Sequence, residues 1–193
     1  MIYLLKITWH VIHEPHSFFE STRQQGWWEP YRLFLIIALV LSIFSPLAWA
    51  LGIDGNSPVN TSLTAQRDVY RWWHDMLFPK FGVWSIFMAM AGLLLEMHII
   101  LIFFTPVLHF VFRGLGGQGP AVHAWKALCY GLAPTMLFGF LPGIALALGV
   151  YATLLQLCVG PSILYRVHEA RAYMLLVIVL SIAIAAFWHG LAI

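Results

Sequence analysis

The fold class of this chain is decided by the stretch FGVWSIFMAMAGLLLEMHIILIFFTPVLHFVF, residues 81–112, which is apolar except for Glu96, His98 and His109. About 20 apolar residues are enough to cross the hydrocarbon core of a bilayer. As one helix this stretch would be roughly 48 Å long, well beyond a core of about 30 Å. Its centre contains no Pro, Asn or Asp that would make a turn between two short spans. We therefore expect one long helix that extends past the bilayer.

The rest of the chain contains four more apolar runs of membrane-spanning length. We expect spans near residues 33–51, 121–141, 143–164 and 172–192, in addition to 81–112. The composition agrees, because 61% of the 193 residues are hydrophobic and 9% are charged, whereas about a quarter of the residues in a soluble domain are charged. The sequence thus predicts an all-α polytopic membrane protein with five transmembrane helices, forming a single membrane domain over residues 1–193.

The basic residues predict the orientation of these spans. With five spans and a cytoplasmic N-terminus, seven basic residues fall on the inner side and three on the outer side, which agrees with the positive-inside rule. The inner set is Lys6, Arg23, Arg32, Arg113, Lys126, Arg166 and Arg171, and the outer set is Arg67, Arg71 and Lys80.

Two further segments are predicted to be amphipathic helices that lie on the membrane surface. In residues 1–30 the apolar positions fit one helical face that ends at Pro15, and in residues 52–80 apolar and aromatic positions also recur at helical spacing. The first face comprises Ile2, Leu5, Trp9 and Ile12, and the second comprises Leu63, Tyr70, Trp73 and Leu77.

Glu96 is the charged residue that the loops and helix ends do not account for. A carboxylate in the middle of an apolar helix costs a few kcal/mol in hydrocarbon and by default indicates a functional role. His98, two residues further on, points to a different face of the helix and cannot form a local dyad with it. Candidate partners from other helices are Lys126, Tyr130 and Gln156. Two interpretations stay open: a proton, cation or polar-ligand site between helices, or a carboxyl that locks the bundle or lies at the membrane edge.

Three histidines near the N-terminus are weak candidates for a metal site. His10, His13 and His16 recur every third residue, and imidazole is a good ligand for zinc, copper or nickel. Pro15 prevents a continuous helix through the third histidine, and neither His-Glu pair of the chain continues into the HExxH motif. We therefore predict no metal and no other cofactor.

Other motifs have plain structural interpretations. Residues 114–119, GLGGQG, satisfy GxGxxG, but they follow a membrane helix instead of a strand and therefore predict a turn. Cys129 and Cys158 lie in apolar runs and are expected to be small buried hydrophobes. The net charge of +2 gives no reason to expect a nucleic-acid partner.

Several short motifs, in order along the chain, resemble the short prokaryotic members of the Yip family, named for eukaryotic Ypt/Rab-interacting proteins. They are Pro15 with Phe18 and Phe19, Gly26 and Pro30, the double glycine Gly116-Gly117 in LHFVFRGLGGQGP, Tyr130 and Pro134 in KALCYGLAP, and RVHEARAYMLLVIV. The resemblance implies a five-span helical domain, here expected in a bacterial inner membrane. Eukaryotic relatives add a cytoplasmic region with an Asp-Leu-Tyr-Gly-Pro motif that this sequence does not contain, so a Rab-binding role is not carried over.

These observations lead to two hypotheses for function. The first is a non-enzymatic scaffold, adaptor or accessory subunit that contacts lipids and other integral membrane proteins, or copies of itself, through lateral helix contacts. The alternative is transport of an ion, a proton or a small polar solute centred on Glu96, with His98 and Gln156 contributing.

Overall fold

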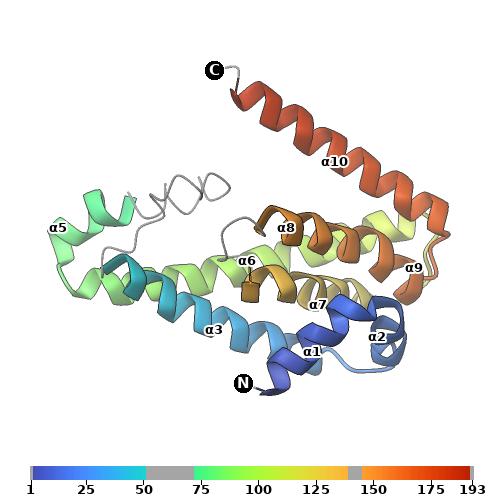
Figure 1. Cartoon of the computed structure of the whole chain (residues 1–193), viewed down its shortest axis with the longest axis horizontal. Coiled ribbons are helices and arrows are strands. Elements are labelled where there is room, and N and C mark those ends of the chain that lie inside the picture. Colours follow the sequence, from blue (N-terminus) through green and yellow to red (C-terminus); the bar gives the residue numbers. More distant parts are fainter. Residues whose placement is uncertain (1, 51–71, 139–144, 192–193) are drawn as a thin grey trace.

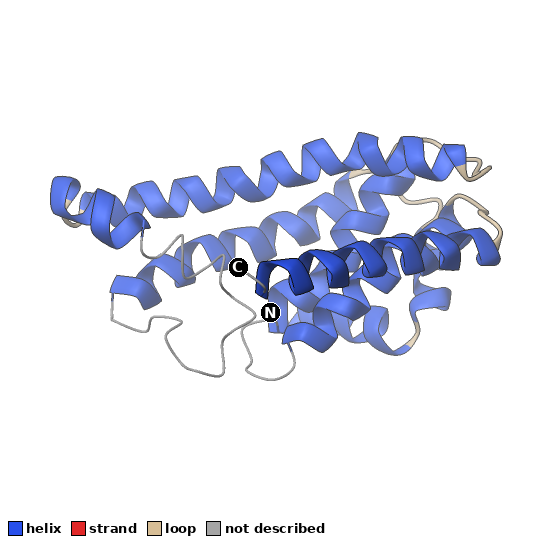
Figure 2. Cartoon of the chain, turned by 90° about the horizontal axis from the view of Figure 1, so that it is seen from above, coloured by secondary structure: helices blue, strands red, loops and turns tan. Residues whose placement is uncertain are grey.

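The chain is a bundle of helices, which the computed structural model describes over residues 2–50, 72–138 and 145–191 (Figure 1). Within these ranges there is no strand (Figure 2). The elements, labelled as in Figure 1, are α1 (Ile2–His13), α2 (Pro15–Thr22), α3 (Trp28–Ala50), the π-helix η2 (Trp73–Leu77), α5 (Phe78–Phe81), α6 (Trp84–Gly114), α7 (Val122–Phe138), α8 (Ala145–Leu154), the π-helix η3 (Leu155–Val159), α9 (Gly160–Leu164) and α10 (Glu169–Leu191).

The long apolar stretch forms one helix, as predicted. α6 has 31 residues and continues through Pro106, so it is about 46 Å long. It begins at Trp84 and not at Phe81 because Gly82 adopts a positive φ of 55°, which breaks the helix between α5 and α6.

Three helical stretches in the described ranges are long and apolar enough to cross a membrane, whereas the sequence predicted five. They are Trp28–Leu47, Trp84–Gly114 and Ala147–Leu164. The other two predicted spans correspond to α7 and α10. Both of those predictions run into residues outside the described ranges, at 139–141 and 192. The structure thus supports a membrane protein with at least these three apolar helices.

Successive long helices run in alternating directions along the bundle (Figure 1). α3 packs against both α6 and α7, and α7 packs against α8. α10 starts beside η3 and α9 and then diverges from the other helices (Figure 1).

Both π-helices are followed by a proline two residues after their last residue, Pro79 after η2 and Pro161 after η3. A proline lacks the backbone N–H, and its ring crowds the carbonyl four residues earlier. The backbone therefore widens, and the Phe78 and Gly160 N–H groups bond the carbonyls five residues earlier.

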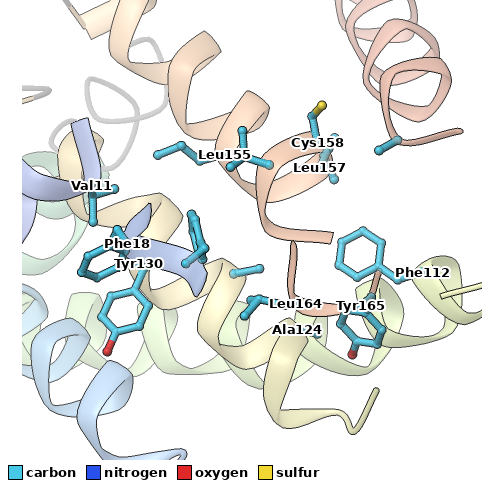
Figure 3. Close-up of a cluster of buried hydrophobic side chains, with 14 of the residues drawn as sticks. Val11, Phe18, Phe112, Ala124, Tyr130, Leu155, Leu157, Cys158, Leu164 and Tyr165 are labelled. Atoms are coloured by element: carbon cyan, nitrogen blue, oxygen red, sulfur yellow. The ribbon is translucent and has the colours of Figure 1, made fainter. Parts of the chain in front are cut away.

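The N-terminal helices pack onto the bundle, α1 against α7 and α2 against α9. The predicted apolar face of α1 is only partly right, because Trp9 is 65% exposed while Thr8 and Val11 are fully buried. The side chains of Ile2 and Leu5 lie outside the described set, as do residues Leu63, Tyr70, Arg67 and Arg71 of the second predicted surface segment. Val11 and Phe18 join residues of α7, η3 and α9 in the main apolar core (Figure 3).

Candidate functional site

Glu96 lies on the outward side of α6, exposed, in a groove between that helix and the η2–α5 segment. The groove has a volume of about 370 Å³ and is otherwise lined by apolar and aromatic residues: Trp72, Trp73, Leu77, Met88, Ala89, Gly92 and Leu93. Along α6 the carboxyl-bearing residue is 12 residues from Trp84, or about 18 Å. A carboxylate in this position is surrounded by the apolar groups of the groove and by the lipid or protein that covers the outer side of α6.

The wall of the groove is fixed by two hydrogen bonds at the break between α5 and α6. The indole Nε1 of Trp73, a residue that is 2% exposed, donates to the carbonyl of Ser85 at 3.0 Å. The Ser85 hydroxyl donates to the carbonyl of Gly82 at 2.6 Å. These bonds hold η2 against the first turn of α6.

His98 faces the opposite way, into the bundle. Its Nδ1 lies 2.7 Å from the Leu94 carbonyl, and its Nε2 lies 3.1 Å from the Tyr31 hydroxyl on α3. Because a carbonyl only accepts, Nδ1 carries the proton and Nε2 accepts from Tyr31. The structure therefore does not bring Glu96 and His98 together.

Lys126 is fully buried and closes the C-terminal end of α2. Its Nζ donates to the carbonyls of Thr22 at 3.0 Å and Arg23 at 2.8 Å. The last carbonyls of a helix have no partner within the helix, and a cation at this end is favoured by the helix dipole. Lys126, which was expected to be a partner of Glu96, instead attaches the N-terminal helices to α7.

The other two expected partners of Glu96 are also engaged elsewhere. The Tyr130 hydroxyl donates to Oε1 of Gln25 at 2.9 Å. Gln156 packs on Gly131, where an added Cβ would lie 2.6 Å from its Cγ. The predicted polar residues are thus distributed over separate locations.

Three residues that carried the family resemblance make side-chain contacts between α2 and α7. The rings of Phe18 and Phe19 contact Tyr130 edge-on, with centroids 4.8 Å and 6.4 Å away (Figure 3 shows Phe18 and Tyr130). Pro15 begins α2, and Pro134 is buried within α7.

The double glycine makes the turn that ends α6. Gly116 has a φ of 89°, and the Gly117 N–H donates to the Phe112 carbonyl at 2.9 Å. A Cβ on Gly117 would lie 2.7 Å from that carbonyl oxygen and 2.8 Å from Cγ2 of Val167. Next to it, the Gln118 N–H donates to the Tyr165 carbonyl at 2.7 Å. The glycine is required because the segment between α9 and α10 packs directly on this turn.

Tyr165 is a central residue that the sequence analysis missed. It is fully buried, and its hydroxyl lies 2.6 Å from Nδ1 of His109 on α6. Burial raises the pKa of Tyr165 to about 12, so the hydroxyl is neutral over the physiological range. The available signal was its position directly after the fourth predicted span, where an aromatic ring with a polar tip is favoured.

The N-terminal histidines do not converge. His10 lies 3.5 Å from the Glu14 carboxylate, His13 bonds the Trp9 carbonyl at 3.1 Å, and His16 lines a cavity between α2 and α9. In the part of the chain that the structure describes, no three His, Cys, Asp or Glu side chains are grouped so as to hold a metal ion. Both cysteines are buried, as predicted.

Comparison with known families identifies one match. A family model described as the Yip1 domain matches residues 9–193. No curated protein and no solved structure matches the chain significantly.

Proposed function

This chain belongs to the Yip1 family, and from this premise we propose that it is a non-enzymatic scaffold, adaptor or accessory subunit of the membrane. It contacts another integral membrane protein through the outward side of α6 that carries Glu96. The partner presents a hydrogen-bond donor, neutral or cationic, to the carboxyl group.

The observation that carries this proposal is the position of Glu96 on the least buried of the three candidate spans. In the apolar window of α6 only 6% of residues are buried within the bundle, against 39% and 44% for the other two candidate spans. Lipid tails can cover the apolar residues of that helix but leave a carboxyl group without a partner, at a cost of a few kcal/mol. A donor on a neighbouring helix removes this cost, although such bonds add only about 1 kcal/mol net.

The distribution of basic residues supports the membrane topology that accompanies the proposal. Arg113 lies in the last turn of α6 and Arg171 in the first turn of α10, and these turns are adjacent because Arg171 Nη1 donates to the Leu115 carbonyl at 2.9 Å. Lys80 belongs to α5, which lies at the other end of the bundle (Figure 1). With the alternating helix directions, this distribution favours a cytoplasmic turn between α6 and α7 and a cytoplasmic N-terminus. The bacterial inner membrane is proposed only from the resemblance to prokaryotic-type members.

Transport centred on Glu96 is the less favoured alternative. A transport path requires polar groups that share one route across the bundle. Glu96 lies on the outside, while Lys126 is bonded to the end of α2 and His98 to Tyr31. These positions favour lateral contact over a path.

Co-purification from native membranes in a mild detergent tests the proposal. We expect chains retained by the wild type to be lost from Glu96→Leu by about tenfold, and retained in part by Glu96→Gln, which can still accept a hydrogen bond. Glu20→Leu, which removes an exposed carboxylate on α2, is the matched control and should retain them. Full retention by Glu96→Leu contradicts the proposal, and so does an ion flux in proteoliposomes that Glu96→Gln abolishes.

A further inference from the structure

A second cavity, distinct from the Glu96 groove, lies where α2, α9 and the start of α10 meet. Its volume is about 380 Å³, which falls within the range of small-ligand sites. It is lined by His16, Ser162, Ile163, Arg166, Val167, His168 and Glu169. The polar residues of this set have no role in the contacts described above.

Arg166 lines this cavity and has an unusual backbone conformation. Its φ of 56° makes it the one non-glycine residue with positive φ in the described ranges. The turn is held on both sides of it, because the N–H groups of Tyr165 and Val167 both donate to the Pro161 carbonyl, at 3.1 Å and 3.2 Å. Such conformations persist only where the surroundings fix them, and they cluster at ligand sites.

The donors in the cavity suit a phosphate group. Arg166 supplies a guanidinium, which matches phosphate oxygens in pairs. His168 accepts a hydrogen bond from the Ala170 N–H at its Nδ1, at 3.3 Å, so a neutral His168 ring carries its proton on Nε2 and can donate from there. His16 adds a further donor. The Ser162 hydroxyl donates its proton to the Val159 carbonyl at 2.9 Å, so toward a ligand it can only accept, which suits an ammonium group and not a phosphate oxygen.

The carboxylate of Glu169 restricts which phosphate compounds can bind in the cavity. A simple phosphate would meet repulsion from this carboxylate, which lines the same cavity as Arg166. A ligand that carries an ammonium group beside its phosphate would satisfy both charges. The charges of the cavity are therefore complementary to those of a zwitterionic ligand.

The location of the cavity suits the polar end of a lipid. Glu169 begins α10, and the apolar run of this helix starts at Ala172. In the topology proposed above, this places the cavity at head-group level on the cytoplasmic side.

We propose that this cavity binds a phosphoethanolamine group, with the phosphate toward Arg166 and His168 and the ammonium toward Glu169. The group is supplied by an aminophospholipid or by a soluble phosphoethanolamine compound. Neither source depends on the lateral partner of α6, so this proposal can fail or hold independently of the proposed function.

Binding measurements on the full chain in detergent test this proposal. The probes are short-chain phosphatidylethanolamine, short-chain phosphatidylglycerol and free phosphoethanolamine. We expect phosphatidylethanolamine to bind at least tenfold more tightly than phosphatidylglycerol, and Glu169→Gln to remove that preference. Free phosphoethanolamine that competes for the site with similar affinity identifies a soluble source, and competition only by the lipid identifies a membrane source.

Variants at Arg166 separate binding from folding. Arg166→Asn removes the guanidinium with a residue that tolerates positive φ, and Arg166→Gly also removes the strain. Both should fold like the wild type and bind phosphatidylethanolamine at least tenfold more weakly. Arg113→Gln, a control at the same end of the bundle, should bind normally. Unchanged binding in both Arg166 variants, or equal binding of the two lipids by the wild type, overturns the proposal.

Discussion

Replacing Lys126 with methionine should release the N-terminal helices from the bundle. Methionine keeps most of the apolar stem but removes the ammonium group that donates to the carbonyls of Thr22 and Arg23, at 3.0 Å and 2.8 Å. Because Lys126 is fully buried and its bond to the Thr22 carbonyl is buried, that carbonyl loses its donor while α2 stays docked.

The change in the free energy of docking has two opposing parts: the loss of two hydrogen bonds, and the removal of the cost of burying an ammonium group. Hydrogen bonds from a charged group contribute about 1.5–3 kcal/mol each, and a buried acceptor left without a donor costs about 1–3 kcal/mol. Removing the buried ammonium group offsets part of this loss of free energy, because its desolvation no longer opposes docking. We expect a net loss of about 2–4 kcal/mol in the free energy of docking, which raises the population of the undocked state by roughly 30-fold to several hundredfold.

Hydrogen exchange of the α2 amides, measured on the detergent-solubilised chain, is the direct assay. Exchange in α2 should accelerate by the factor given above, while exchange in the centre of α6 should not change. Lys6→Met, the same substitution at an exposed lysine, should leave both rates within about threefold. Unchanged or slower exchange of α2 in Lys126→Met would refute the reasoning. The free-energy cost of burying the ammonium group would then be at least as large as the stabilisation from its two hydrogen bonds.

Two further substitutions probe the turn region. Gly117→Ala should lower the free energy of unfolding by about 1–3 kcal/mol, because its Cβ would press on the Phe112 carbonyl at 2.7 Å. Thermal unfolding in detergent measures this, and Gly114→Ala, with nothing within 4 Å, should show no loss; equal losses would argue against the close approach. For Tyr165, burial raises the pKa from 10.0 to about 12, so its stabilisation is complete below pH 10 and is lost as the pH rises toward 12. Between pH 9 and pH 11 the wild type should therefore lose more stability than Tyr165→Phe, and equal losses would show that the hydroxyl is not protected.

Local sequence signals were sufficient where one element alone decides the outcome. α6 could be predicted as one helix because its apolar run contains no residue that would form a turn in its middle. The double glycine indicated a tight turn at Gly116, where φ is indeed positive. The prolines after η2 and η3 were visible in the sequence, but the widening of the helix before each was not inferred from them.

The partners of the polar residues could not be read from the sequence. Lys126 and Tyr130 were expected near Glu96, yet they bond to residues more than 100 positions earlier in the chain. Periodicity says which face of a helix is polar but not which distant segment packs on it. On α6 even the face was undetermined, because the helix is apolar on all sides and lacks a stripe that would mark its packed side.

Photo-crosslinking from two positions on α6 tests the central claim most directly. Ile99 lies three residues after Glu96 and shares its face, whereas Ile102 is about 120° away around the helix; they are 57% and 62% exposed. In native membranes, a crosslinker at Ile99 should capture a protein, Glu96→Leu should abolish that adduct, and the same crosslinker at Ile102 should capture only lipid. Lipid adducts alone from both positions, or a protein adduct at Ile99 that persists in Glu96→Leu, would contradict the claim that Glu96 marks a lateral protein contact.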